Sequence, residues 1–187
     1  MATLQENIQR VTAYNWQLVE AGIPYFIWRD GVFLNIDGPP AYAVDAPAPD
    51  PGEIVAIFCA GIGNVDRRLL ELPIPKNGTY PGYDGGTEAW RQNYWNNSVW
   101  FDLDQAAQGD IAFHPYQHNG EDDQGHWAYC TGGADDPLIQ SYPNTWEGTI
   151  VKPGVNADDT LRQSHERWGN GNYYTVLIKA ESWLSSE

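Results

Sequence analysis

The spacing of apolar residues changes along the chain, from a helical period near the N-terminus to short strand-like runs in the second half. Leu4, Ile8, Val11 and Leu18 recur at the spacing of one helical face, and Gly22 follows as a helix terminator. Helices that precede strands, without strict alternation of the two, are typical of the α+β class. This order excludes a regular alternation of parallel strands and helices.

A second helical pattern lies in 58–75, FCAGIGNVDRRLLELPIP, where Val65 and Leu69 share one face and Pro73 ends the helix. TEAWRQNYW at 87–95 predicts a third, short helix. Four later runs are bounded by Gly, Pro or Asp and predict antiparallel strands: GDIAF, GHWAYC, LIQSY and NYYTVLIKAESWL. We therefore expect N-terminal helices packed on a central antiparallel sheet.

The length and charge of the chain restrict the classes of partner. The 187 residues suit one domain, 1–187, with the Pro- and Ala-rich segment 31–52 as a surface insertion. A net charge of −15, with ten Lys and Arg that form no cluster, argues against nucleic acid and against an anionic membrane surface. No run approaches the roughly 20 apolar residues of a membrane span. The start, MATLQENIQR, lacks an apolar signal core, so we expect synthesis in the cytoplasm.

Cys59 is the residue whose position most favours chemistry. It lies at the expected start of the second helix, where the partial positive charge of the helix end stabilises a thiolate. His126, on a predicted strand, could accept the thiol proton, and Gln140, on the next strand, could orient the imidazole. The alternative is that Cys59 is simply a small buried residue. Cys130 is expected to be a buried thiol without chemistry, and nothing in the sequence demands a disulfide.

At these residues the chain resembles the NlpC-like cell-wall peptidases, a papain-like group of cysteine hydrolases. The matching elements are GIPYFIW with Tyr25, FCAG with Cys59, QGDIAF with Asp110, GHWAYC with His126, and LIQSY with Gln140. They follow the first helix in the family's order and extend to about residue 141. The resemblance implies a papain-like α+β fold of NlpC type.

The resemblance also implies an activity, the cleavage of an amide bond in a peptidoglycan stem peptide. Cys59 would attack the carbonyl, His126 would carry the proton to the leaving amine, and Gln140 would hold the imidazole ring. Backbone N–H groups at the helix start would stabilise the oxyanion. The family's site tyrosine and the abundance of Trp and Tyr suggest a set of substrate contacts: Tyr25, Trp28, Tyr83 and Trp90.

The sequence departs from the family pattern at several positions. Phe58 and Ala60 flank the cysteine where the family often has Asp and Ser, and Gln140 stands where His is usual. The segment between Tyr25 and Cys59 is longer than expected. The CHAP group, which includes N-acetylmuramoyl-L-alanine amidases, is therefore a close neighbour with the same order of cysteine and histidine.

Two other classes of function stay open. His114 and His118, with acidic residues nearby, raise the possibility of a metal-dependent hydrolase, but Pro115 argues against the helix on which such a pair would form a site. We expect no metal and no cofactor, and a plain loop at 114–123 between two strands. A non-catalytic module that grips the cell wall in an aromatic groove is the other alternative.

The expected partner is peptidoglycan, reached after release or delivery of the protein. A phage lysin, a tail-associated lysin or a delivered toxin would fit, with a separate targeting domain or a phage assembly to supply wall binding. The insertion 31–52 joins Tyr25 to Cys59, so we expect it to border the substrate groove. His165 is expected at the surface or behind the site.

Overall fold

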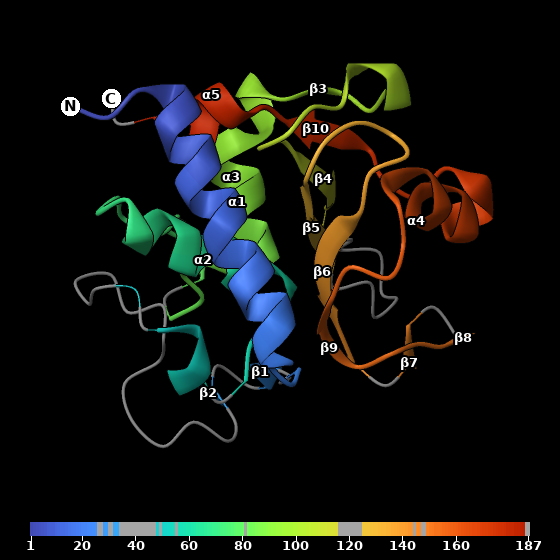
Figure 1. The fold of residues 1–187 in the computed structure, drawn as a ribbon, viewed down its shortest axis with the longest axis horizontal. Coiled ribbons are helices and arrows are strands. Elements are labelled where there is room, and N and C mark those ends of the chain that lie inside the picture. Colours follow the sequence, from blue (N-terminus) through green and yellow to red (C-terminus); the bar gives the residue numbers. More distant parts are fainter. Residues whose placement is uncertain are drawn as a thin grey trace.

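The protein has an α+β fold, with helices packed on an antiparallel sheet, as the sequence predicts (Figure 1). The computed structural model describes residues 1–25, 28–29, 32–33, 48, 50–54, 56–80, 82–115, 125–143, 145–146 and 149–185. In Figure 1 the helix α1 (Leu4–Ala21) crosses in front of α2 (Cys59–Leu69), and the sheet lies beside them.

The remaining helices are α3 (Thr87–Tyr94), α4 (Leu161–Arg167) and α5 (Ala180–Trp183). The main sheet has six antiparallel strands in the order β3 (Val99–Trp100), β10 (Val176–Ile178), β4 (Ile111–His114), β5 (His126–Cys130), β6 (Leu138–Tyr142) and β9 (Gly154–Asn156). Two small sheets pair β1 (Trp28–Arg29) with β2 (Val32–Phe33), and β7 (Thr145–Trp146) with β8 (Thr149–Ile150). Short 3-10 turns lie at Pro51–Glu53, Trp95–Asn97, Leu103–Gln105 and Gly169–Gly171.

Helix α1 begins and ends where the sequence predicts. Thr3 and Glu6 form a capping box, in which each side chain accepts the backbone N–H of the other. Gly22 ends the helix in the left-handed conformation, with φ of 62°, which a side chain would disfavour. In the part of the chain that the structure describes, no helix combines the length and the apolar character needed to cross a membrane.

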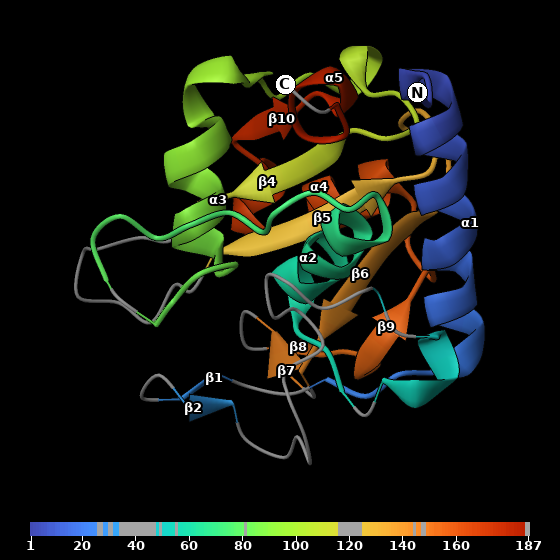
Figure 2. The same cartoon turned by 90° about the vertical axis from the view of Figure 1, so that its left-hand side faces the viewer.

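The two faces of the sheet carry different layers. Along β5, Trp127 and Tyr129 join a hydrophobic cluster with α1, α2 and α3, whereas Ala128 and Cys130 join a second cluster that includes Leu161 of α4. This is the alternation expected of a strand that is buried on both faces. Figure 2 shows α2 in front of the sheet and α1 along one side. The antiparallel pairing of β4 with β5, which the sequence predicts, is confirmed.

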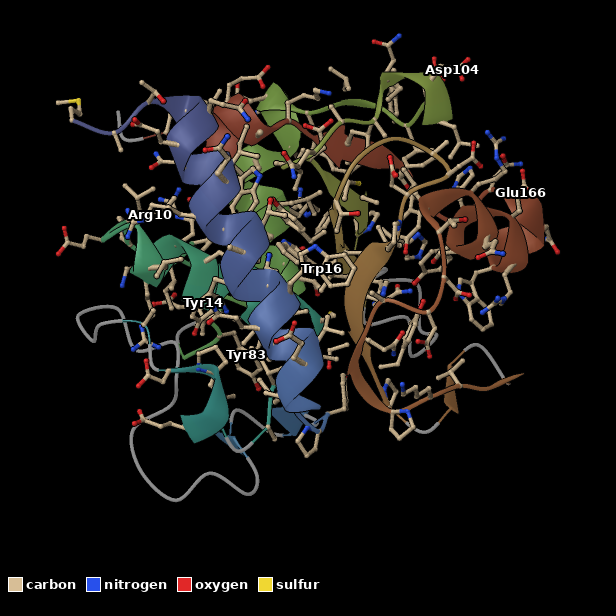
Figure 3. The ribbon with its side chains drawn as sticks, in the orientation of Figure 1. Arg10, Tyr14, Trp16, Tyr83, Asp104 and Glu166 are labelled. Atoms are coloured by element: carbon tan, nitrogen blue, oxygen red, sulfur yellow. The ribbon has the colours of Figure 1, made fainter. Side chains whose placement is uncertain are left out.

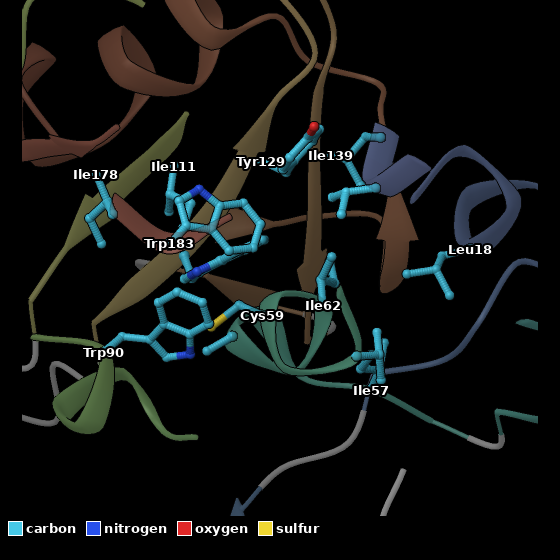
Figure 4. Close-up of a cluster of buried hydrophobic side chains, with 14 of the residues drawn as sticks. Leu18, Ile57, Cys59, Ile62, Trp90, Ile111, Tyr129, Ile139, Ile178 and Trp183 are labelled. Carbon is cyan, nitrogen blue, oxygen red and sulfur yellow. The ribbon is translucent and has the colours of Figure 1, made fainter. Parts of the chain in front are cut away.

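Helix α2 approaches β5 closely because of a glycine. A Cβ atom built on Gly63 would lie 2.6 Å from ring carbons of both Trp127 and Trp90, which is shorter than any real contact. Gly63 follows Cys59 by about one helical turn, so the close approach also brings the start of α2 to the strand. Asn64, the next residue of α2, accepts a hydrogen bond from the Trp90 indole N–H at 3.1 Å and so also joins α2 to α3. Figure 4 shows Cys59 and Trp90 among the buried side chains of this cluster.

Two polar contacts join α1 to α2. Arg10 donates to the carbonyl of Leu69 at the end of α2, and Figure 3 shows this arginine on the α2 side of α1. Asn15 donates to the buried carboxyl of Asp66 at 2.9 Å. Burial raises the pKa of Asp66 well above its usual range. The first two helices are therefore fixed to one another by both packing and hydrogen bonds.

We predict that Gly63→Ala destabilises the protein, because the added methyl group would push α2 away from two tryptophan rings. Overpacking of this kind lowers the free energy of unfolding by about 1–3 kcal/mol. Chemical denaturation measures the change, and Gly52→Ala is the matched control because an added Cβ there meets nothing within 4 Å. Equal stability of the Gly63→Ala and Gly52→Ala variants would show that the close approach of α2 does not matter.

Candidate functional site

Cys59 is the first residue of α2, as the sequence predicts, and its thiol is enclosed by protein. Only 6% of its surface is exposed, and it belongs to the main hydrophobic cluster. Burial raises the pKa of the Cys59 thiol to about 11, although backbone N–H groups of Trp127, Ala60 and Cys59 itself favour the thiolate. Desolvation is the larger effect, so the resting thiol is neutral at physiological pH. A base is then needed to make it a nucleophile.

His126 and Gln140 form a buried pair on neighbouring strands. His126 begins β5 and Gln140 lies in the middle of β6, and neither side chain is exposed, each at 0%. The imidazole Nε2 lies 3.0 Å from the amide Oε1 of Gln140. With the Gln140 amide oxygen toward the ring, Nε2 is the donor and Nδ1 holds the lone pair, because an amide oxygen only accepts.

The imidazole plane is fixed by an aromatic ring as well as by Gln140. The Tyr142 ring stacks on His126 with centroids 4.9 Å apart and planes only 4° from parallel. Tyr142 follows Gln140 by two residues, so both side chains lie on the same face of β6. Sequence reasoning overlooked Tyr142, and this period-two spacing in LIQSY could have identified it.

The thiol meets β5 at the peptide group that joins His126 to Trp127. The N–H of Trp127 points at the Cys59 sulfur and favours its charged form. The structure joins His126 to Gln140 as expected, but it does not bring the imidazole to the thiol. The His126 and Gln140 side chains lie on the α4 face of the sheet, with Ala128 and Leu138, whereas Cys59 packs on the α2 face. The sequence offered no signal for the backbone contact, because any residue at 127 except proline would supply the same N–H group.

Tyr25 lies near the thiol, as the resemblance implies. It is half-buried and packs against the main cluster. Burial raises the pKa of the Tyr25 hydroxyl, and the nearby Cys59 adds to the increase, because a thiolate would repel a phenolate. A protonated hydroxyl at this position could donate a hydrogen bond to a bound carbonyl.

One of the expected substrate contacts is wrong. Trp90 is a core residue with 0% of its surface exposed, and its ring packs edge-on against Trp127 and Trp183. The prediction failed because the sequence pattern of a short helix with one aromatic residue does not distinguish a residue that faces a groove from one that faces the core. Tyr83 is 37% exposed and accessible to a ligand (Figure 3), whereas the side chain of Trp28 lies outside the described residues.

The second cysteine plays the structural part expected of it. Cys130 ends β5 and is a free, buried thiol, as Cys59 is. Burial raises its pKa, and the neighbouring Asp110 carboxylate raises it further. Asp110 itself pairs with Lys179 and accepts the backbone N–H groups of Ala107 and Ala180. The Asp of the QGDIAF element therefore ties β4 to α5.

The other described histidines lie near His126, one opposite it in the β4–β5 pairing and one on the far side of Tyr174. His114 ends β4, where its Nδ1 lies 2.9 Å from the carbonyl oxygen of Tyr173 and its ring stacks on that tyrosine. His165 of α4 is buried and accepts the backbone N–H of Tyr174 at 3.0 Å. Of its two expected positions it therefore takes the one behind the His126–Gln140 pair and not the one at the surface. Among the described residues no group of three or more His, Cys, Asp or Glu could hold a metal. His118 is outside those residues.

Two predicted segments cannot be placed against the site. Most of the insertion 31–52 and most of the connection 114–123 lie outside the described residues. The expectations that the insertion borders the groove and that the connection is a plain loop stay predictions. Three acidic residues of the metal alternative, Glu121, Asp122 and Asp123, fall in the same undescribed stretch, whereas the fourth, Asp110, is paired with Lys179.

Comparisons with known proteins assign no family to the chain. No family model matches the sequence. Searches of curated proteins and of solved structures likewise find no match. The candidate site therefore rests on the residues and the geometry described above.

We predict that Cys59 reacts with a thiol alkylator about 100-fold more slowly in the folded protein than in the unfolded chain at neutral pH. Its pKa is about two units above the ordinary value of 9.0, and only the thiolate reacts. The folded-state rate should rise about tenfold per pH unit up to pH about 11, as measured by peptide mass spectrometry, which separates Cys59 from Cys130. A rate that levels off near neutral pH would show instead that Cys59 rests as a thiolate.

Proposed function

We propose that the protein is a cysteine hydrolase of papain-like, NlpC-type fold that cleaves an amide bond in peptidoglycan stem peptides. The observation that carries the proposal is the buried His126–Gln140 pair, with Cys59 held at the adjacent peptide group by the N–H of Trp127. Such hydrolases use a cysteine at a helix start and an imidazole oriented by a polar partner. Here the two groups lie on opposite faces of β5, so the proposed reaction requires the imidazole to move to the thiol.

The order of the elements supports the same proposal. The nucleophile begins a helix that follows the first helix, and the base and its orienting residue lie on successive strands of an antiparallel sheet. Tyr25, from the GIPYFIW element, lies near the thiol. These are the positions that the resemblance to the NlpC-like peptidases assigns to the site, and the choice of peptidoglycan as substrate rests on that resemblance.

In the proposed reaction the His126 imidazole first moves to the thiol side of β5. It then takes the thiol proton at Nδ1 as the Cys59 sulfur bonds to the amide carbonyl carbon. The tetrahedral oxyanion is stabilised by N–H groups at the start of α2, where the helix dipole is positive. The C–N bond then breaks, and His126 gives its proton to the leaving amine. Water, deprotonated by His126, hydrolyses the thioester, which releases a carboxylic acid and restores the thiol.

The neutral state of the Cys59 thiol before substrate binds is compatible with the proposed reaction. The Cys59 thiol is protonated because it is buried, so no charge has to be kept in the apolar cluster before substrate binds. Charge develops only during attack, when N–H dipoles already face the reacting atoms. Such pre-organised dipoles lower the barrier because they need no rearrangement.

We predict that Cys59→Ala reduces the release of soluble muropeptides from purified peptidoglycan by about a thousandfold or more, because the nucleophile is lost. Cys130→Ala is the matched control. It removes the other buried thiol from the opposite face of β5 and should keep most of the activity. Undiminished release by the Cys59→Ala protein would refute the thiol mechanism.

Mass spectrometry of the digest identifies the bond that is cut. New amino termini within the stem peptide would show an endopeptidase. Stem peptides that begin with their first residue, released from intact muramic acid, would show an amidase of the CHAP type. Binding to the wall without release of any fragment would favour the non-catalytic module.

We further predict that the activity survives a strong chelator and is lost to a thiol alkylator. The proposed steps use a sulfur, an imidazole and backbone dipoles, and none of them calls for a Lewis acid. Muropeptide release is measured after each treatment and again after zinc is added back. Loss on chelation with recovery on zinc would favour the metal-dependent alternative, in which His114 and His118 would be the first ligands to test.

A further inference from the structure

The amide of Gln140 has a second partner besides His126. The hydroxyl of Tyr174 lies 3.4 Å from the same Oε1 atom, and the His126 Nε2 lies 3.0 Å from it. An amide oxygen has two lone pairs and can accept both bonds. All three side chains are buried, so water does not compete for the amide. Whatever orients Tyr174 therefore also orients the group that holds the imidazole.

Tyr174 belongs to a line of hydroxyl groups that runs through α4. Its oxygen lies 2.8 Å from the Oγ of Ser164, and the same Ser164 hydroxyl is also within hydrogen-bonding range of the Tyr142 hydroxyl. The indole N–H of Trp168 then donates to the Tyr142 oxygen at 3.3 Å. Both ends of the line touch the same imidazole, because the Tyr142 ring is the one stacked on His126.

The indole sets a direction along this line. An indole N–H donates and never accepts, so the Tyr142 oxygen is the acceptor at that end. The Tyr142 proton is then available to Ser164, the Ser164 proton to Tyr174, and the Tyr174 proton to the Gln140 oxygen. In this direction every hydroxyl donates one bond and accepts one bond.

The opposite amide orientation would reverse the line. If Gln140 turned its NH₂ group toward His126 and Tyr174, each hydroxyl would donate back toward Trp168. The Tyr142 oxygen would then face two donors, the indole and Ser164, and its own proton would leave the line. The tautomer of His126 would be reversed as well, with the proton on Nδ1, where it could no longer accept one from a thiol.

We propose that a one-way chain of hydrogen bonds, anchored by a donor that cannot accept, holds His126 in the Nε2–H tautomer. The chain consists of Trp168, Tyr142, Ser164, Tyr174 and Gln140. Its members other than Gln140 are positioning residues, since they act on the imidazole through Gln140 or through stacking. The tautomer itself is a property of the resting protein, and only its consequence for catalysis rests on the proposed function.

Long-range nitrogen–proton NMR of the histidine rings tests the chain directly. Protein with ¹⁵N-labelled histidine is measured at about pH 8, above the ordinary imidazole pKa. The chain has four histidines, so a His126→Gln variant identifies the His126 signals by their loss. In the unaltered protein the proton should be on Nε2. In Tyr174→Phe the ratio of tautomers should move toward Nδ1–H by about fivefold, as expected for the loss of one ordinary hydrogen bond.

Trp168→Phe tests the anchor and leaves Gln140, Tyr174 and Ser164 unaltered. It keeps an aromatic ring and removes the N–H group, so the tautomer ratio should move in the same direction. Tyr129→Phe is the matched control, because it deletes a buried hydroxyl bonded to Thr12 at 2.6 Å on the other face of the sheet. It should lower stability by a similar amount and leave the His126 tautomer unchanged. If Tyr174→Phe does not fold, Ser164→Ala breaks the chain at the next link.

An unchanged tautomer in both Tyr174→Phe and Trp168→Phe would overturn the proposal, since Gln140 would then suffice alone. A shift in Tyr129→Phe as large as in Tyr174→Phe would also overturn it, because general loosening would explain both. Kinetics on peptidoglycan add a separate readout, in which Tyr174→Phe lowers kcat more than it changes KM. If the Cys59→Ala protein proved fully active, the proposed hydrolase would fail while the NMR result on the chain would stand.

Discussion

The close contact between α2 and β5 is the constraint on which the rest of the site depends. Gly63 lets the helix come so near the strand that two tryptophan rings occupy the space of its missing side chain. The same approach carries Cys59, about one turn earlier, to the backbone N–H of Trp127. A helix held farther from the sheet would leave the thiol without this contact.

Strand β5 contributes side chains to the hydrophobic clusters on both faces of the sheet. Trp127 and Tyr129 pack toward α2, while the alternate residues face α4, where Gln140, Tyr142 and Tyr174 surround the imidazole of His126. The thiol meets the strand at the peptide group between the two sets. Helix α2 therefore holds Cys59 on one face of β5, and the layer around α4 holds the His126 imidazole on the other.

Burial determines the electrostatic character of this arrangement. The pKa of the Cys59 thiol is raised because a thiolate would lose its hydration, and the pKa of Tyr174 is raised for the same reason. Neutral groups in a dry interior are organised by hydrogen bonds rather than by charge pairs, so the direction of each bond matters. This is why a donor-only indole at one end of a chain can influence the protonation of a ring at the other.

The sequence by itself determined the class of fold and much of the candidate site. Helical periodicity and capping residues are local, so α1, the start of α2 at Cys59, and the strands that carry His126 and Gln140 could be predicted from short stretches. The tertiary structure alone decided that Trp90 lies in the core, that His165 is buried, and that the N–H of Trp127 faces the thiol. Those outcomes depend on contacts between segments that are far apart in the sequence, and short stretches of sequence do not determine which of these segments pack together.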